Sequence, residues 1–140
     1  MHAMNRNEKV SKIRTICVYC GSGPGTDPAF VEAARAFGTA LADNGIHLVF
    51  GGGAVGIMGT IAKAVLDRGG TVTGIIPEFL VAREHALRGA DNLIVTRDMH
   101  ERKRKMSEMA DAFVALPGGI GTLEEVVEQI TWVQLGRHRK

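Results

Sequence analysis

Short apolar runs alternate with helix-period segments and glycine loops along the chain. Strands are predicted at Ile13–Cys20, Ile46–Phe50, Thr71–Ile76, Leu93–Thr96 and Asp111–Leu116. Repeated strand–loop–helix units imply a parallel sheet with helices on both of its faces. We therefore predict an α/β fold, a Rossmann-like doubly wound parallel sheet in three αβα layers. No strand follows the last helical pattern before Lys140, so we expect the sheet to lack its last strand.

Capping residues and glycines set the expected helix boundaries. Asp27 and Pro28 suit a helix start, and Asn44-Gly45 suits its end. A second helix is predicted from about Ile57 to Gly69-Gly70, and a third over Met99 to Ala110 with Asp98 as its cap. Residues 78–90 have no clean period, so a loop with a short helix is expected there.

The length and composition favour one globular domain. The chain has 140 residues, 45% of them hydrophobic, which is enough for a core. We expect residues 1–12 to be a disordered or tag-like start and residues 13–140 to form a nucleotide-binding catalytic domain. A net charge of +2 is too small to indicate nucleic acid, and no apolar stretch is long enough to span a membrane. A soluble cytoplasmic protein is expected.

Cys17 and Cys20 form a C-x-x-C pair, which raises the question of redox or zinc chemistry. The pair lies within a predicted strand and not at a helix start, and odd spacing points the side chains to opposite faces. No second pair completes a zinc site, and the histidines have no metal spacing. We predict core cysteines, no metal site and no cofactor.

The segment Gly51 to Gly56 fits G-x-G-x-x-G between a strand and a helix, and Glu78 lies roughly where a ribose-binding acid would be expected. This spacing is typical of dinucleotide-binding enzymes. However, the loop follows the second strand and not the first, and no residues remain for a substrate domain. A mononucleotide or packing role is the favoured interpretation.

Residues 112–125 read as a buried strand, a glycine loop and a helix start, the layout that binds phosphate. Glu124 and Glu125 lie just inside that helix, where a site built only for phosphate would not place carboxylates. Thr122 and Glu125 also fit the Thr-x-x-Glu capping box. On sequence alone, a capping box and a catalytic Glu125 are equally supported and compatible.

A basic run, residues 102–105, lies on the predicted helix from Met99 to Ala110. Arg102 and Lys103 follow Met99 by three and four positions, so they fall on the apolar stripe, whereas Arg104 and Lys105 are largely off it. A cation on an inward stripe needs an anionic partner. The candidates are a structural carboxylate, such as Glu84, Glu124 or Glu125, and the phosphate or base of a nucleotide.

Taken together, two segments resemble the Lonely Guy family of cytokinin riboside 5′-monophosphate phosphoribohydrolases. They are Met99-His100-Glu101-Arg102-Lys103, matching MHxRK, and Pro117 to Glu125, matching PGGxGTxxE. The glycine loop 51–59 and Cys20-Gly21-Ser22 are similar as well. The resemblance runs from about Ile13 to Lys140. Family members usually continue with another strand and helix, so the resemblance predicts a truncated or shortened chain.

The resemblance implies hydrolysis of the N-glycosidic bond of N6-modified AMP, and also of AMP, to free base and ribose 5-phosphate. It makes Arg102 and Glu125 the catalytic pair. The positions that match nucleotide contacts are Glu84, Arg102, Lys103, Gly118, Gly119, Ile120, Gly121, Thr122, Leu123, Glu124, Glu125 and Thr131. It also implies a homodimer with active sites near the interface.

The proposed chemistry suits these residues. Cleavage develops positive charge on the ribose, and a carboxylate such as Glu125 can stabilise it or orient the attacking water. We expect Glu125 to stay ionised if Arg102 is near. The alternative that uses the same loops is a non-catalytic nucleotide-binding module.

Overall fold

A computed structural model describes residues 13–87 and 92–140 of the chain. Its strands are β1 (Thr15–Tyr19), β2 (His47–Phe50), β3 (Val72–Pro77), β4 (Asn92–Thr96) and β5 (Ala112–Ala115). Its helices are α1 (Pro28–Asp43), α2 (Gly56–Asp67), the short 3-10 helix η2 (Glu78–Leu80), α3 (Met99–Met109) and α4 (Ile120–Gln134). The predicted order of elements is confirmed, and the expected start at residues 1–12 lies outside the described residues.

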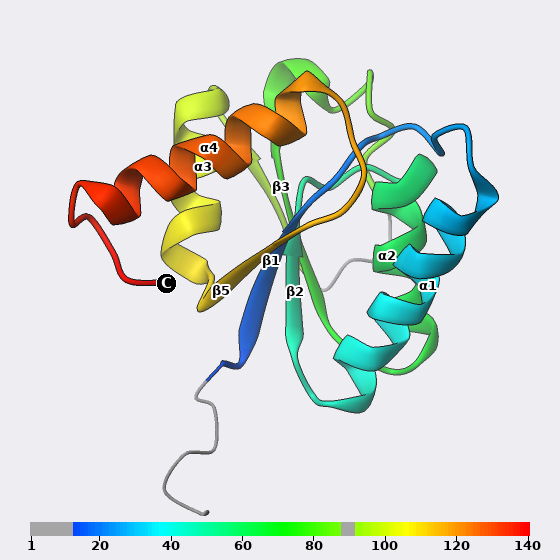
Figure 1. The fold of residues 1–140 in the computed structure, drawn as a ribbon. Helices are drawn as coiled ribbons and strands as arrows, with labels where there is room; N and C mark the ends of the chain where they lie inside the picture. Colours follow the sequence, from blue (N-terminus) through cyan, green and yellow to red (C-terminus); the bar gives the residue numbers. More distant parts are fainter. Residues whose placement is uncertain (1–12, 88–91) are drawn as a thin grey trace, which may run out of the picture.

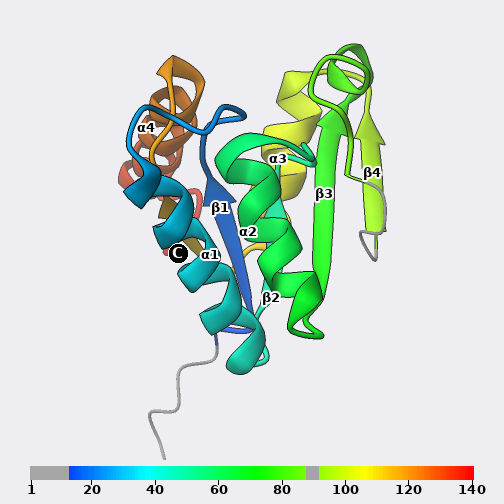
Figure 2. The ribbon, with the colours of Figure 1, turned by 90° about the vertical axis from the view of Figure 1, so that its right-hand side faces the viewer.

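The five strands form one parallel sheet in the order β4-β3-β2-β1-β5. Cys17 of β1 pairs with Val49 of β2 on one side and with Phe113 of β5 on the other. The chain winds outward from β1 to β4 (Figure 2) and then crosses back to place β5 on the other side of β1 (Figure 1). This reversal lies between β1 and β5, and such a switch point opens a crevice at the carboxyl ends of the strands.

Helices cover both faces of the sheet, as the three-layer prediction requires. α1 and α2 lie on one side, and α3 and α4 lie on the other (Figure 1). The side chain of Asp27 accepts a hydrogen bond from the Ala29 amide at 2.9 Å and caps α1. Asp98 caps α3 by accepting from the Glu101 amide at 2.8 Å. Both predicted caps are confirmed.

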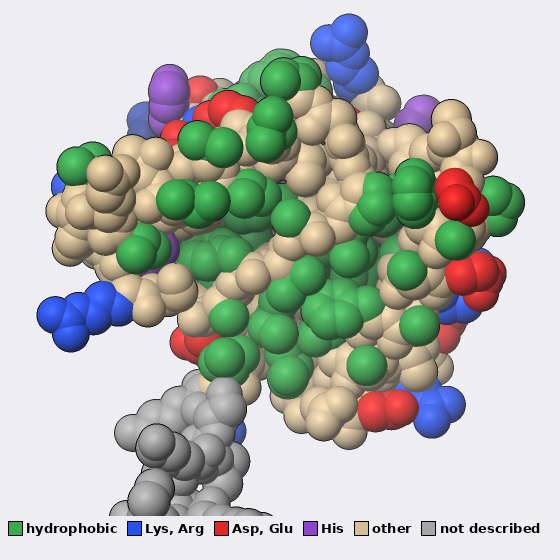
Figure 3. Space-filling view, viewed as in Figure 1, with side chains coloured by type: hydrophobic (Ala, Val, Ile, Leu, Met, Phe, Trp, Pro, Cys, Tyr) green, Lys and Arg blue, Asp and Glu red, His purple; other side chains and the backbone are tan. Residues whose placement is uncertain are grey.

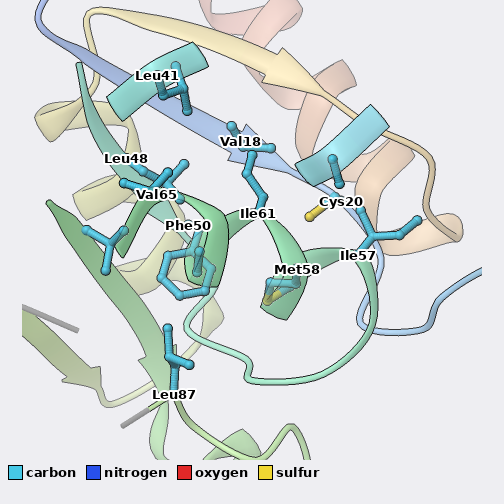
Figure 4. Packing of buried hydrophobic residues seen from close by; sticks show 13 residues of the cluster. Val18, Cys20, Leu41, Leu48, Phe50, Ile57, Met58, Ile61, Val65 and Leu87 are labelled. Atoms are coloured by element: carbon cyan, nitrogen blue, oxygen red, sulfur yellow. The ribbon is translucent and has the colours of Figure 1, made fainter. Parts of the chain in front are cut away.

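The sheet separates two apolar clusters. Under α1 and α2, Val18, Leu48, Phe50 and Ile61 pack together with Cys20 (Figure 4). On the other face, Cys17, Tyr19, Val49, Ile75 and Met106 pack beneath α3. The two thiols are free, buried and on opposite faces, so the prediction of core cysteines is confirmed. No helix of the described part of the chain is long and apolar enough to cross a membrane.

Candidate active site

A cavity of about 430 Å³ opens at the carboxyl edge of the sheet, where β1 and β5 lead into their loops. Five segments far apart in the sequence build it: the loop after β1, the start of α2, the segment from η2 to Glu84, the start of α3 and the start of α4. Its lining residues are Cys20, Gly21, Ser22, Gly23, Met58, Leu80, Glu84, Met99, Arg102, Gly119, Ile120, Gly121, Thr122, Glu124 and Glu125. The cavity therefore lies at the topological switch point of the fold.

The first turn of α4 presents unused backbone amides to this cavity. Gly119 is the N-cap, and none of the described side chains caps the helix. Within residues 13–87 and 92–140, the amides of Gly119 to Thr122 have no hydrogen-bond acceptor; the first amide of the helix to find one is that of Leu123, bonded to Gly119 O at 3.3 Å. Free amides and the positive end of the helix dipole together form a site for an anion.

The predicted capping box of Thr122 and Glu125 is wrong, because α4 begins earlier than the box requires. With Gly119 as the N-cap, Thr122 and Glu125 both lie inside the helix. A side chain on Gly118 would overlap the Thr122 hydroxyl, so the glycine lets the chain turn tightly into the helix. Glu125 is therefore not used as a cap and is left for another role.

The N-terminus of α2 differs from that of α4, since the chain itself occupies its amides. Ile57 N donates to Gly23 O and Met58 N donates to Gly21 O, each at 3.1 Å. The loop between Gly51 and Gly56 therefore supports the loop after β1 and offers no comparable row of free amides. The Gly21 amide in turn bonds Pro117 O at 3.0 Å, which holds the loop after β1 against the start of α4. This geometry argues against dinucleotide binding at G-x-G-x-x-G and favours the packing interpretation.

Arg102 is only 5% exposed and is fixed by the backbone of two strands. Its Nε donates to Ile75 O and its Nη2 donates to Gly51 O, both at 2.8 Å. Nη2 also lies 3.8 Å from Glu84 Oε2, a buried oxygen that has no hydrogen bond among the described residues. The predicted inward orientation is confirmed, and the guanidinium lines the cavity in a fixed position.

Lys103 is also buried, but its ammonium turns away from the cavity towards α4. Nζ donates to Glu124 Oε1 at 2.7 Å and to Glu128 Oε2 at 3.0 Å. Burial lowers the pKa of Lys103, and the two carboxylates more than offset this, so the pKa is raised overall. Glu124 was among the partners expected for this stripe, whereas Glu128 was not.

Glu125 lines the cavity next to this cluster, and its environment changes its protonation. Burial raises the pKa of its carboxyl to about 7; the charge of Arg102 opposes the rise, and that of Glu124 adds to it. The expectation that Glu125 stays ionised beside Arg102 is therefore met only in part at neutral pH, because the desolvation of the carboxyl outweighs the attraction of the guanidinium. A carboxyl that titrates near neutrality is suited to general acid–base work.

Cys20 lines the same cavity, but it is not a nucleophile. Burial raises the pKa of its thiol to about 12, so the thiolate is not formed at neutral pH. Among the described residues, no group of His, Cys, Asp or Glu side chains is arranged to hold a metal ion.

Most of the predicted site residues come together here. Glu84, Arg102, Gly119, Ile120, Gly121, Thr122, Glu124 and Glu125 line the cavity, and Gly118 lines an adjacent one of about 320 Å³. Lys103, Leu123 and Thr131 line neither; Thr131 is exposed on α4, where its hydroxyl bonds Val127 O. The prediction omitted Gly21, Ser22 and Gly23, although they follow β1 at the same edge of the sheet as the α4 loop.

The chain is similar to curated proteins along most of its length. A cytokinin riboside 5′-monophosphate phosphoribohydrolase from Oryza sativa subsp. japonica is 49% identical over 133 residues, which are 95% of this chain and 55% of that protein. One from Rhodococcoides fascians is 48% identical over 128 residues, covering 91% of this chain and 65% of that protein. The chain thus spans less than two thirds of the length of these relatives.

Solved structures share the fold at lower identity. The molybdenum cofactor carrier protein from Chlamydomonas reinhardtii matches with a TM-score of 0.72 at 25% identity, over 86% of this chain and 72% of that chain. The molybdenum cofactor binding protein from Rippkaea orientalis matches with a TM-score of 0.68 at 27% identity, over 84% and 70% of the two chains.

A family model described as "possible lysine decarboxylase" matches residues 58–140, which include both predicted motifs and all of α3 and α4. The family model and the curated relatives match overlapping parts of the chain. The chain belongs to the Lonely Guy family.

Proposed function

We propose that the protein hydrolyses the N-glycosidic bond of N6-modified AMP, and of AMP itself, to release the free base and ribose 5-phosphate. One observation carries the proposal: the unused amides at the start of α4 and the carboxyl of Glu125 open onto the same cavity. The amides suit a phosphate group, and the carboxyl suits acid–base chemistry at a sugar. The relatives named as phosphoribohydrolases support the same reaction.

The phosphate is proposed to bind the amides of Gly119 to Thr122, where the helix dipole favours an anion. Binding energy from this remote group would hold the ribose still while the bond breaks. The Gly21–Gly23 loop, bonded to Pro117, forms the facing wall. The ribose and base would then extend across the cavity towards Glu125 and Arg102.

Glu125 is proposed to act as a carboxylate at the anomeric carbon. As the bond from C1′ to the base nitrogen breaks, its electron pair leaves with the base and positive charge grows on the ribose. A water molecule adds to C1′ and passes its proton to Glu125, which returns a proton to the departing base. Arg102, held by Gly51 O and Ile75 O, would stabilise negative charge on the nucleotide without having to reorganise.

The description of the family model as a lysine decarboxylase finds little support in the cavity. Pyridoxal phosphate enzymes need a lysine for the Schiff base. None of the described residues that line the cavity is a lysine. Lys103, the nearest lysine in sequence to this site, is already held by Glu124 and Glu128.

A homodimer is the proposed assembly, formed through the outer face of α4. This face carries an apolar stripe at helical spacing whose side chains are solvent-exposed: Ile120 (82%), Leu123 (57%), Val127 (50%) and Ile130 (63%). Hydrophobic side chains gather along this helix in the space-filling view (Figure 3). Ile120 also lines the cavity, so a second copy seated on α4 would lie next to the site.

The test is incubation with N6-isopentenyladenosine 5′-monophosphate and with AMP, with free base followed by chromatography. Wild type should release base from at least the modified nucleotide, and Glu125→Gln should not. Glu108→Gln, an exposed carboxylate on α3, is the matched control and should retain the wild-type rate. Absence of base from both nucleotides, with a folded protein, would refute the proposal.

A non-catalytic binding module is the second candidate, because proteins named as a cofactor carrier and as a cofactor binding protein share this fold. It predicts that AMP raises the melting temperature without any base appearing. The same incubation therefore separates the two functions.

A further inference from the structure

Lys103 connects two helices through a pair of carboxylates on one of them. Its ammonium lies 2.7 Å from Glu124 Oε1 and 3.0 Å from Glu128 Oε2, and its side chain is only 11% exposed. Glu124 and Glu128 are four residues apart, so they project from the same face of α4. Lys103 thus contacts α4 at two successive turns.

We propose that Glu128, acting through Lys103, is a positioning residue that holds α4 against α3 so that Glu125 faces the reacting bond. Glu128 does not line the cavity, so it has no direct part in the chemistry. The inference rests on the proposed function, since it assigns a purpose to the position of Glu125. It also implies that Lys103 binds the carboxylates of α4 and does not bind the nucleotide.

Apolar packing alone holds α4 weakly. Gln129 is its only buried residue, and its outer stripe faces solvent. Val126 provides its contact with the cluster beneath α3, around Tyr19 and Met106. A helix with so little buried surface depends on polar contacts to fix its rotation and its position on the sheet. The ion pairs of Lys103 with Glu124 and Glu128 are such contacts.

These ion pairs lie where they would control the geometry of the site. Arg102 and Lys103 are neighbours on α3, and Glu124 and Glu125 are neighbours on α4. Arg102 is fixed to the strands by Gly51 and Ile75, so it provides a rigid reference point. When Lys103 binds Glu124 and Glu128, the next side chain round the helix, Glu125, is directed into the cavity beside Arg102.

Of the two carboxylates that bind Lys103, Glu128 should hold it more strongly than Glu124 does. Its side chain is 23% exposed against 50% for Glu124, so its bond to Lys103 is less screened by water. Its other oxygen, Oε1, is buried without a hydrogen-bond partner in the described chain, so Lys103 is the partner on which this carboxylate depends. Loss of Glu128 therefore removes the more buried of the two ion pairs that join Lys103 to α4.

The experiment compares wild type, Glu128→Ala, Glu128→Gln and the control Glu108→Ala, whose carboxylate is exposed and lies 3.8 Å from Arg104. Base release gives kcat and KM, and hydrogen exchange of α4 reports its docking without requiring activity. Glu128→Ala should lower kcat by about 10- to 100-fold, as expected for a misplaced catalytic group, with KM changed less than about twofold. Hydrogen exchange over residues 120–134 should be faster in Glu128→Ala than in wild type. Glu128→Gln should lose less of kcat than Glu128→Ala, and Glu108→Ala should match wild type in both measurements.

Two results would overturn the inference. An unchanged exchange rate in α4 for Glu128→Ala would show that Glu128 does not hold the helix, whatever happens to kcat. A raised KM with an unchanged kcat would show that Glu128 contacts the nucleotide. If wild type releases no base, the proposed function fails, and the exchange measurement still tests the ion pairs themselves.

Discussion

At the scale of the residue, Glu125 and Arg102 differ in how their surroundings constrain them. Glu125 is a carboxyl whose desolvation raises its pKa to about 7. Arg102 is a cation that is almost fully buried and bonded to two strand carbonyls. The contribution of Glu125 to stability and activity should therefore depend on pH, whereas that of Arg102 should be revealed by removing its side chain.

Replacing Glu125 by Gln should stabilise the protein above neutral pH. Since folding raises this pKa, the neutral carboxyl is favoured in the folded state; its contribution to stability is complete below about pH 4.5 and is lost as pH rises through about 7. The variant avoids that loss, so its free energy of unfolding at pH 8 should exceed that of wild type by about 2 to 3 kcal/mol. Urea unfolding at about pH 4.5 and pH 8 measures the difference. Equal stability at pH 8 would contradict the assigned pKa.

The same group should shape the activity. If the carboxylate is the active form of Glu125, kcat/KM should rise with pH and level off above about 7. The pH–rate profile of base release checks this. A rate that falls as pH rises through 7 would indicate that the neutral carboxyl is the active form.

Truncation of Arg102 should cost stability as well as activity. Arg102→Ala removes the side-chain hydrogen bonds to Gly51 O and Ile75 O and the cation beside Glu84. The expected loss is about 2 to 5 kcal/mol of the free energy of unfolding. Arg104→Ala, an exposed arginine on the same helix, should change stability by less than about 0.5 kcal/mol. Similar losses in both variants would show that the strand contacts of Arg102 contribute little.

At the scale of the element, two glycine loops that look alike in sequence have different uses. The amides at the start of α2 are bonded to Gly21 O and Gly23 O, whereas those at the start of α4 have no acceptor in residues 13–87 and 92–140. The pattern G-x-G-x-x-G could not reveal this, because the acceptors come from the loop after β1, far earlier in the chain.

Binding of AMP should therefore protect one helix start and not the other. With AMP present, hydrogen exchange at Gly119 to Thr122 should slow, because the phosphate would accept bonds from these amides. The amides of Ile57 and Met58, already bonded, should be unaffected. Protection of Ile57 and Met58 alone would place the phosphate at the other loop.

Much at this scale was predictable from the chain. Apolar runs and caps such as Asp27 and Asp98 indicate the strands and helix starts, because they depend on local spacing and local hydrogen bonds. The inward orientation of Arg102 and Lys103 followed from helical periodicity. The start of α4 at Ile120 did not follow, because a tight turn through Gly118 competes with the Thr122 cap. The pairing of Lys103 with Glu128 depends on how α3 meets α4, which no local pattern encodes.

At the scale of the whole molecule, the site lies at the reversal of strand order and close to an exposed apolar surface. The cavity collects residues from the loop after β1, from α2, from the segment after β3 and from α3 and α4, and its lining includes Ile120 from the stripe of α4. A solvated stripe of this kind is unfavourable for a monomer. Assembly and chemistry are therefore expected to be linked through α4.

Charges placed on the stripe should break the proposed dimer. Val127→Asp with Ile130→Asp puts two carboxylates on the face that a second copy would cover, and should yield a monomer in sedimentation velocity. Phe79→Asp, at an apolar side chain of η2 that is 61% exposed, should leave the oligomeric state unchanged, because Phe79 is not part of the α4 stripe. A wild type that sediments as a monomer would refute the interface.

The central claim is that one cavity unites phosphate binding at α4 with cleavage of a glycosidic bond at Glu125. The most direct test compares kcat/KM for base release from N6-isopentenyladenosine 5′-monophosphate with that from the nucleoside lacking the phosphate. Because remote binding energy is proposed to drive the reaction, the nucleotide should be favoured by at least about 1,000-fold. Equal rates for the two substrates, or no release from the nucleotide by folded protein, would contradict the account.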